Sequence, residues 1–359
     1  MTVFALPLAL SLSAFAADPP AAPSAPDAAA AAAASAPSEK PKPTVNLSGI
    51  VYAHWGLDLT EGANLASAFD LDRAYVRADG KLDDHWSTRV TLDANRQKAA
   101  ELELTDATGA PIVVEVPEDA RLRVFVKHAW LAYKGGDVKL RAGVIDTTYV
   151  PGTEQFLGTR WLSKMALDEV KWQSTADIGV AGSGEHKDGL ISWAAGVFNG
   201  EGFAEPEING GKAVQARVTV DGLASGKKLN LPVSAFVEEE LNGKGTDSTL
   251  TWAASAGFKH ENFVTLAEYG MRTTGDVTGT SLSVTAMPKV PDVLGILARL
   301  DQYDPDGNVD EDGSMKVIGG LTHDFAEKIG VAAQYERVQF QDSAAVPEHG
   351  IFVRMQAGF

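Results

Sequence analysis

The sequence predicts an all-β protein, a transmembrane antiparallel β-barrel of about sixteen strands with short periplasmic turns and long external loops. Three observations support this prediction. Polar and apolar residues alternate with period two from Thr44 onward, most alternating segments run for about ten residues, and their connections alternate between short and long. An even number of strands would place both ends of the barrel on the periplasmic side.

Composition narrows the class of protein further. Of 359 residues, 45% are hydrophobic and 22% are charged, which is too apolar for a disordered chain. The 35 glycines and 7 tryptophans are typical of strands joined by turns. The chain has no cysteine, which excludes disulfides, a thiol nucleophile and a Cys-ligated zinc site. A net charge of −17 argues against nucleic acid as a partner.

The first 43 residues are expected to lie outside the barrel. Residues 1–16 are apolar and end in Ala14-Phe15-Ala16, the pattern of a signal-peptidase site, although no Lys or Arg precedes them. We therefore predict a signal peptide over 1–16. Residues 17–43 are rich in Ala, Pro and Ser and predict a periplasmic linker, with a contact to the cell wall as the alternative. The barrel is expected over 44–359.

The strands are expected where the alternation is cleanest, over 71–82, 87–95, 138–144, 214–221 and 229–240. Tight turns are expected near 83–84, 135–136, 187–188, 225–226, 261–262, 288–291 and 325–327. Long connections are expected over 99–120, 150–174, 200–210 and 301–314, with shorter ones near 60–66, 241–247, 273–279 and 341–348.

A soluble β-sandwich is the competing interpretation, because alternation alone describes both architectures. The apolar faces favour the membrane barrel, since they carry small and β-branched residues with an aromatic residue near one end. These expected girdle residues are Trp130, Trp193, Trp252, Phe263, Tyr269 and Phe359. The opposite faces are charged along nearly every strand, and no long apolar helix competes as a membrane segment.

Several segments resemble bacterial outer-membrane porins, and more closely the phosphate-selective porin O/P family. They are FDLDRAYVRADGKLDDHWSTRVTLD at 69–93, LRAGVIDTTYVPG at 140–152, STADIGVAGSG at 174–184, WAAGVFNGEG at 193–202 and the terminal IFVRMQAGF. The resemblance implies a sixteen-stranded barrel, usually trimeric, whose third external loop folds inward. The terminal Phe359 resembles the signal by which the barrel-assembly machinery recognises such chains, and its strand is expected to close against Val45–Leu57.

Alternation assigns a set of basic residues to the inner wall of the barrel. They are Arg73, Arg77, Lys81, Arg89, Lys139, Arg141, Arg217 and Arg354. Guanidinium groups match the geometry of carboxylate and phosphate oxygens, so this wall predicts a lumen that favours anions, phosphate among them. The alternative is that these residues pair with lumen carboxylates such as Asp79, Asp93 and Glu336 and only hold the interior together.

Segment 150–174 occupies the place of the third external loop. It is rich in aromatic and basic residues, a composition that suits packing inside a barrel better than exposure to solvent. Arg160 and Lys164 are therefore the candidates for a constriction, with a position at a trimer interface as the alternative. Segments 99–120 and 301–314 each carry six acidic residues and no basic one, and predict an acidic mouth, with binding of divalent cations shared with lipopolysaccharide as an alternative.

These features predict a passive channel of the bacterial outer membrane for small hydrophilic solutes and ions. Expected partners are outer-membrane lipid, lipopolysaccharide, the assembly machinery and two further copies in a homotrimer. No catalytic residues, cofactor or metal site are predicted, because no nucleophile or metal-binding motif is present and the calcium-like spacing at Asn308, Asp310 and Asp312 ends on Gly319. The alternatives are a barrel enzyme and a structural barrel that anchors the envelope through its linker.

Overall fold

The computed structural model describes residues 42–63, 67–97, 100–105, 111–116, 119–205, 207, 210–224, 227–241, 248–290 and 293–359, without the side chains of 97–120 and 223–230. The predicted signal peptide 1–16 lies outside these residues, as does the predicted linker 17–43 except for its last two residues. All described residues belong to one unit, Pro41–Phe359.

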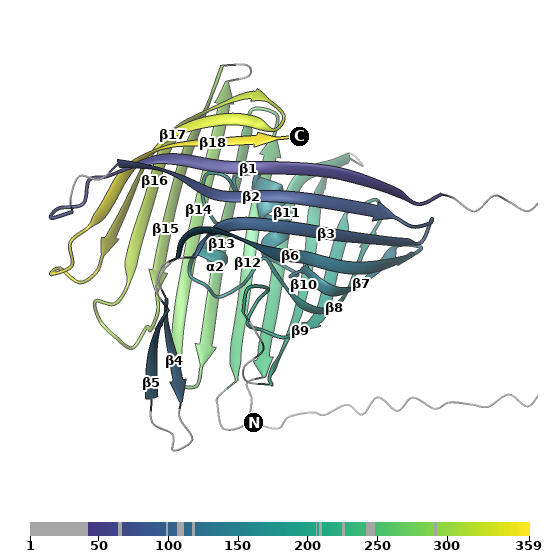
Figure 1. Cartoon of the computed structure of the whole chain (residues 1–359), viewed down its shortest axis with the longest axis horizontal. Helices are drawn as coiled ribbons and strands as arrows, with labels where there is room; N and C mark the ends of the chain where they lie inside the picture. The colour runs from purple at the N-terminus through teal and green to yellow at the C-terminus, as the bar shows by residue number, and fades with distance from the viewer. Residues whose placement is uncertain are drawn as a thin grey trace, which may run out of the picture. The chain divides into compact units, whose positions relative to one another are not determined.

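Sixteen antiparallel strands close into one barrel, which confirms the predicted fold class (Figure 1). They follow one another around the barrel in chain order, and the first pairs with the last. The strands are β1 (Thr44–Asp58), β2 (Ser67–Lys81), β3 (Trp86–Gln97), β6 (Asp119–Gly135), β7 (Val138–Asp146), β8 (Ala176–His186), β9 (Ile191–Phe198), β10 (Lys212–Ala224), β11 (Lys227–Leu241), β12 (Thr249–His260), β13 (Phe263–Thr274), β14 (Val277–Val290), β15 (Leu294–Asp304), β16 (Ser314–Ala326), β17 (Ile329–Phe340) and β18 (Glu348–Gly358).

The barrel closes where the sequence predicted it. Residues 50–58 of β1 pair with residues 350–358 of β18. Gly49 and Phe359 exchange backbone hydrogen bonds of 3.3 and 3.0 Å, so the ladder continues to the last residue. Because every strand has two neighbours, no backbone edge is left unpaired in hydrocarbon.

The outer face of the wall is apolar and the inner face is polar, as the alternation predicted. On β10, Val214 and Val218 are 45% and 48% exposed, whereas Gln215 between them is 2% exposed and faces inward. Aromatic residues lie near both ends of the outer face, for example Trp193 near the tight turns and the contacting pair Trp252 and Tyr269 near the long loops. This arrangement is typical of a membrane-spanning barrel.

The assignment of Trp130 to the outer face is wrong. Its side chain is 7% exposed and lies on the inner wall. Thr91 pairs with His128 and the next residue, Leu92, pairs with Val126, which leaves Lys127 as a bulge in β6. One extra residue reverses the alternation beyond it, so Trp130 points inward although Val126 points outward.

Most connections fall where they were expected, with three differences. β14 continues to Val290, into the turn expected at 288–291, and the connection expected over 273–279 is a tight turn whose Gly275 has a φ of 57°. The predicted loop 99–120 contains a separate two-stranded sheet, β4 (Ala100–Thr105) and β5 (Pro111–Val116).

Candidate functional site

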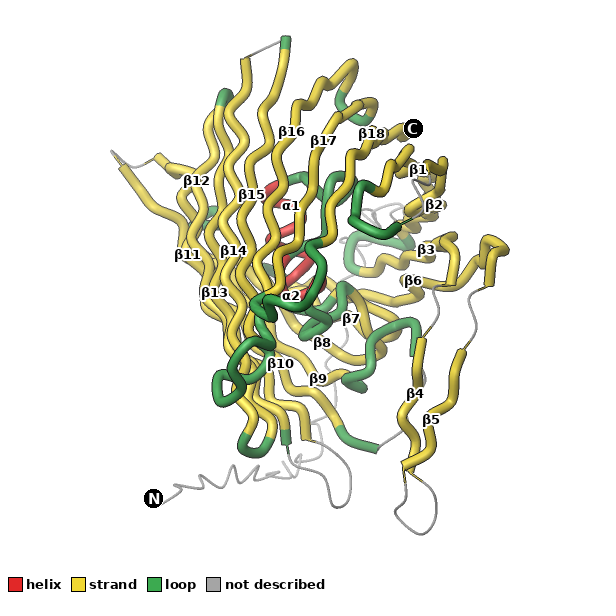
Figure 2. Tube along the Cα trace, turned by 90° about the vertical axis from the view of Figure 1, so that its left-hand side faces the viewer, coloured by secondary structure: helices red, strands yellow, loops and turns green. Residues whose placement is uncertain are grey.

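The connection between β7 and β8, residues 147–175, folds into the barrel and is called the lumen loop below. It contains α1 (Val150–Leu157) and α2 (Ala166–Glu169), which lie within the ring of strands (Figure 2). Its buried apolar side chains are Tyr149, Val150, Leu157, Trp161, Leu162, Met165, Leu167 and Trp172. They pack against inner-wall residues from Phe236 on β11 to Ala332 on β17, as the loop's composition predicted.

Local sequence sets the shape of this loop. Pro151 lies in the first turn of α1, where a missing N–H costs nothing. Gly158 ends the helix in the left-handed region with a φ of 69°, and its N–H donates to the Glu154 carbonyl at 2.8 Å. The Tyr149 ring stacks on Phe236 with centroids 5.1 Å apart, which fixes the start of α1 against the wall.

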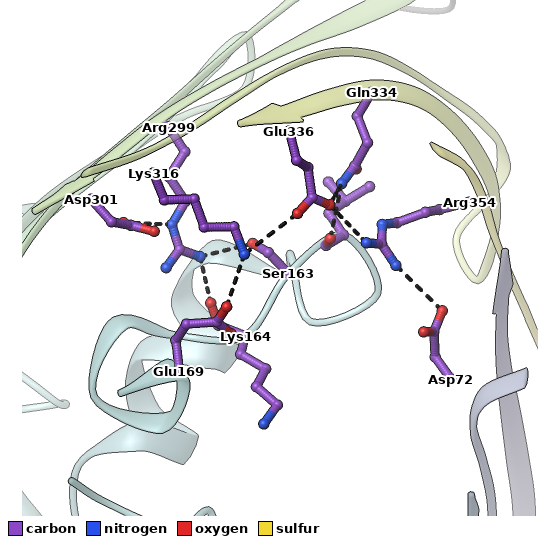
Figure 3. A network of polar contacts seen from close by, with 11 residues as sticks. Asp72, Ser163, Lys164, Glu169, Arg299, Asp301, Lys316, Gln334, Glu336 and Arg354 are labelled. Atoms are coloured by element: carbon purple, nitrogen blue, oxygen red, sulfur yellow. Dashed lines mark hydrogen bonds and ion pairs between the residues drawn. The ribbon is translucent and has the colours of Figure 1, made fainter. Parts of the chain in front are cut away.

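Polar contacts hold the far half of the lumen loop to β15, β16 and β17 (Figure 3). Arg299 pairs with Asp301 at 2.8 Å and also donates to the Ser163 hydroxyl at 2.8 Å and to the Lys164 carbonyl. Lys316 pairs with Glu169 of α2 at 2.8 Å and with Glu336 at 3.4 Å. The loop is therefore fixed by charged side chains as well as by apolar packing.

Arg160, a predicted constriction residue, pairs within the lumen loop. Its Nε lies 3.0 Å from Glu154 and its Nη2 lies 3.7 Å from Asp168. Burial raises the pKa of Glu154, although the Arg160 guanidinium acts in the opposite direction. The three charges give the loop an internally paired cluster.

Lys164 is the second predicted constriction residue. Its backbone carbonyl accepts a hydrogen bond from Arg299, and its side chain takes no part in that contact. Figure 3 shows the ammonium directed away from Arg299 and Lys316. The side chain borders a cavity of about 310 Å³, together with Lys171, Glu240 and Arg272. Among the described residues, no carboxylate lies within 4.0 Å of the Lys164 ammonium.

The inner faces of β2, β3, β6 and β7 form a wall with more basic than acidic groups, called the basic wall below. The name covers the six basic residues Arg73, Arg77, Arg89, Lys127, Lys139 and Arg141 and the carboxylates Asp79, Asp93 and Asp146. Two further carboxylates of β2 are paired, Asp70 with Arg96 at 2.7 Å and Asp72 with Arg354 at 3.5 Å. Three of the bases are paired at 2.6 Å, namely Arg73 with Asp93, Arg89 with Asp79 and Arg141 with Asp146. The predicted alternative of internal pairing therefore describes half of this wall.

The other half of the basic wall has no carboxylate partner. Arg77, Lys127 and Lys139 have none within 4.0 Å among the residues that the structure describes. Lys127 is 7% exposed, donates to the Tyr75 hydroxyl at 3.3 Å and lies 4.8 Å from the centre of that ring. Lys139 lies 5.0 Å from the centre of the Trp130 ring. Cation–π contacts thus replace ion pairs at two of the three positions.

Sequence reasoning missed Lys127. The signal was present, because two polar residues, Lys127 and His128, stand side by side between Val126 and Ala129 and shift the parity of the alternation. Such a change of parity indicates a bulge, and it places the bulged residue and its successor, His128, both within the barrel.

The remaining predicted lumen residues occupy three different settings. Lys81 lies at the tight-turn end, is 62% exposed and pairs with Asp84 at 3.2 Å. Arg354 pairs with Glu336 at 2.7 Å and with Asp72 at 3.5 Å. Arg217 donates to the Thr219 hydroxyl at 3.0 Å and borders a cavity of about 830 Å³ beside α1.

No helix among the described residues is long and apolar enough to cross a membrane. No protein-family model matches the chain, and no curated protein matches it.

Solved structures do match. OmpF of Salmonella typhi, in complex with daunomycin, has a TM-score of 0.64 at 11% identity, over 88% of this chain and 97% of that one. The anion-selective porin of Comamonas acidovorans has a TM-score of 0.59 at 13% identity, over 89% of this chain and 100% of that one. OmpT of Vibrio cholerae in its trimer form has a TM-score of 0.59 at 13% identity, over 88% and 100%. The chain therefore has the fold of a bacterial outer-membrane barrel.

Proposed function

We propose that the chain is a passive outer-membrane channel for small hydrophilic solutes and ions, and that its lumen prefers anions, with phosphate among the ions admitted. The single observation that supports the preference is the basic wall, where three of six cations have no carboxylate partner among the described residues. The lumen loop packs on the opposite wall, so solutes pass between this loop and the basic wall.

Physical chemistry supports passive passage over catalysis. A lumen selects ions by its width and by the sign of its charges, so a permanent excess of cations on one wall suffices to favour anions. Arg77, Lys127 and Lys139 have no carboxylate within 4.0 Å among the described residues, whereas the charges of the lumen loop near Arg160 pair with one another. A passing anion therefore meets its main attraction on the basic wall.

The test is the reversal potential of the purified protein in a planar bilayer under a potassium chloride gradient. We expect a potential of the sign set by chloride. A potential set by potassium would overturn the anion preference, and a protein that inserts without conducting would overturn the channel. Replacing chloride by phosphate on one side tests whether phosphate passes.

Further proposals concern processing and assembly. We infer that residues 1–16 are removed as a signal peptide and that 17–43 link the barrel to the periplasm, which N-terminal sequencing of the mature protein tests. We also propose a homotrimer that is embedded in outer-membrane lipid and lipopolysaccharide and inserted by the assembly machinery through β18. The trimer form of one structural neighbour supports the homotrimer, and native mass spectrometry in detergent is the check.

A further inference from the structure

The connection that follows β9 places one aromatic side chain on the basic wall. Phe203 stacks on Phe125 of β6, with ring centroids 5.8 Å apart. The Lys127 ammonium, from the same strand, lies 5.7 Å from the centre of the Phe203 ring. A long connection between two strands therefore reaches the inner wall at the bulged lysine of β6.

Backbone contacts hold Phe203 in this place. Its N–H donates to the carbonyl of the first residue of β8 at 3.0 Å, and the Gly200 N–H donates to the Asp177 carboxylate at 2.8 Å. Between these contacts Gly202 has a φ of 86°, and a Cβ there would lie 2.9 Å from the Ser174 side chain. Glycine suits both the backbone conformation and the close approach. The start of the connection is thus fixed to β8, and its ring is directed onto β6.

Two aromatic rings cover the Lys127 ammonium. The centre of the Tyr75 ring is 4.8 Å away, the centre of the Phe203 ring is 5.7 Å away, and the lysine is only 7% exposed. An ammonium has three N–H groups, and one of them donates to the Tyr75 hydroxyl at 3.3 Å. Among the described residues the other two have no acceptor, and cation–π contact takes the place of hydrogen bonds.

The neighbouring carboxylates do not supply the missing acceptor. Asp93 and Glu154 both interact electrostatically with Lys127. Each is bound by an arginine instead, Asp93 by Arg73 at 2.6 Å and Glu154 by Arg160 at 3.0 Å. Lys127 therefore keeps two N–H groups that an anion could accept from, and the rings cover them.

We propose that Phe203 is a specificity-determining residue of the channel, because its ring keeps passing anions from direct contact with Lys127. The proposal rests on the proposed channel function and adds a shield to it. The charge of Lys127 still attracts anions through space, since the Coulomb energy falls only with the inverse of the distance. An anion that hydrogen-bonded to the ammonium would be retained, and conduction requires that bound ions leave readily. The ring therefore preserves attraction and prevents retention.

The first experiment measures access to Lys127 in the folded barrel and needs no current. The detergent-folded protein is treated with a sulfonated amine-acetylating reagent, and peptide mass spectrometry follows each lysine with time. Lys81 is the internal control, since its side chain is 62% exposed. We expect Lys127 to react at least about tenfold more slowly than Lys81 in the wild type, and at least about fivefold faster in Phe203→Ala than in the wild type. The Lys81 rate should not change.

The second experiment tests the consequence for passage. Inorganic phosphate is added to single channels in potassium chloride, and the concentration that halves the current is measured for wild type, Phe203→Ala, Lys127→Met and the double variant. Phe203→Ala should lower this concentration at least about fivefold, because phosphate then reaches the two N–H groups. In the Lys127→Met background the same substitution should change it by less than about 1.5-fold, since the interacting partner is gone.

Three further variants separate the ring from other effects. Phe203→Tyr keeps the ring and should match the wild type in both experiments. Phe203→Leu keeps an apolar side chain without a ring, and it should also raise the acetylation rate of Lys127 if the alanine variant does not fold. Phe352→Ala removes a ring from β18, four strands away around the barrel, and should leave the Lys127 rate unchanged.

Two outcomes would overturn the proposal. One is a Lys127 that is acetylated as fast as Lys81 in the wild type, or equally fast with and without the ring. The other is a phosphate block that strengthens equally with and without Lys127, because the ring would then only narrow the lumen. If the folded protein does not conduct, the proposed function fails, and the acetylation rates still decide whether Phe203 covers Lys127.

Discussion

Lys127 is the most informative position for testing the proposed selectivity. Its ammonium is fixed between the Tyr75 and Phe203 rings, 4.8 and 5.7 Å from their centres, and has no carboxylate partner among the described residues. Lys127→Met keeps most of the length and apolar volume of the side chain and removes its charge. The expected result is a weaker anion preference with conductance retained.

The size of the effect follows from Coulomb's law. An anion that passes about 5 Å from this ammonium gains about 1 kcal/mol in a water-like medium and about 3 kcal/mol at an effective dielectric constant of about 20. A cation loses the same amount, so the difference between the two ions is at least about 2 kcal/mol before screening. Salt at about 0.1 M screens over about 10 Å and reduces this difference. We therefore expect the chloride-to-potassium permeability ratio to fall at least about threefold.

The assay is the reversal potential of wild type, Lys127→Met and Lys81→Met under one salt gradient. Lys81 is the matched control, because it carries the same charge at the tight-turn end, 62% exposed and paired with Asp84. Its removal should change the ratio by less than about 1.5-fold, since an exposed pair contributes little. An equal loss in both variants, or no loss in Lys127→Met, would refute the assignment of the preference to the basic wall.

Three further predictions concern the lumen loop and the wall. The raised pKa of Glu154 means that a falling pH protonates it before an ordinary glutamate, so anion preference should rise more steeply in the wild type than in Glu154→Gln. Lys316→Met leaves the Glu169 carboxylate without its 2.8 Å partner, and single-channel recordings should show larger current fluctuations from a loosened loop. Gly143→Ala should fail to fold into detergent micelles, as judged by gel mobility without heating, because its Cβ would lie 2.2 Å from the Ala129 carbonyl oxygen at a φ of 119°.

Each of these has its own control. Glu348→Gln, at the start of β18, should leave the pH response of the wild type intact, and a pH response in Glu154→Gln as large as in the wild type would contradict the assignment. Lys328→Met, in the turn before β17, should leave the current as steady as in the wild type. Gly319→Ala should fold normally, because no atom lies within 4 Å of its added Cβ, and normal folding of Gly143→Ala would disprove the steric argument.

The barrel was predictable because the apolar pattern of its outer face can be identified within each strand's own sequence. Lipid contact requires an apolar residue at every second position. The pattern that includes Val214 and Val218 can therefore be recognised without knowing which strands lie beside it. Strand pairing followed from chain order, since each strand pairs with the next. The closing pair was also predictable, because β1 and β18 are the only ends that remain.

The site was less predictable because its contacts join distant parts of the chain. Glu169 meets Lys316 across 147 positions, and Ser163 meets Arg299 across 136. No local pattern encodes these partners. One signal of the docked loop was present in the sequence and was overlooked. The inward positions of β13 and β15, which are otherwise mostly polar, include the apolar residues Leu266 and Leu297. Apolar side chains inside a wet barrel indicate that something packs on them, and here it is the lumen loop.

The docking of this loop has a consequence for biogenesis. Apart from Tyr52 on β1, the wall residues that share a cluster with Trp161, Leu167 and Trp172 lie on strands that follow the loop in the chain. During translocation these side chains emerge first and stay without their cover until β11 to β17 arrive. The unfinished chain therefore exposes an apolar segment in its middle until those strands have formed. In a variant that keeps Trp161 as its only tryptophan, the emission should therefore shift to shorter wavelength only once β17 has joined the sheet, and an earlier shift would mean that the loop docks on a half-built sheet.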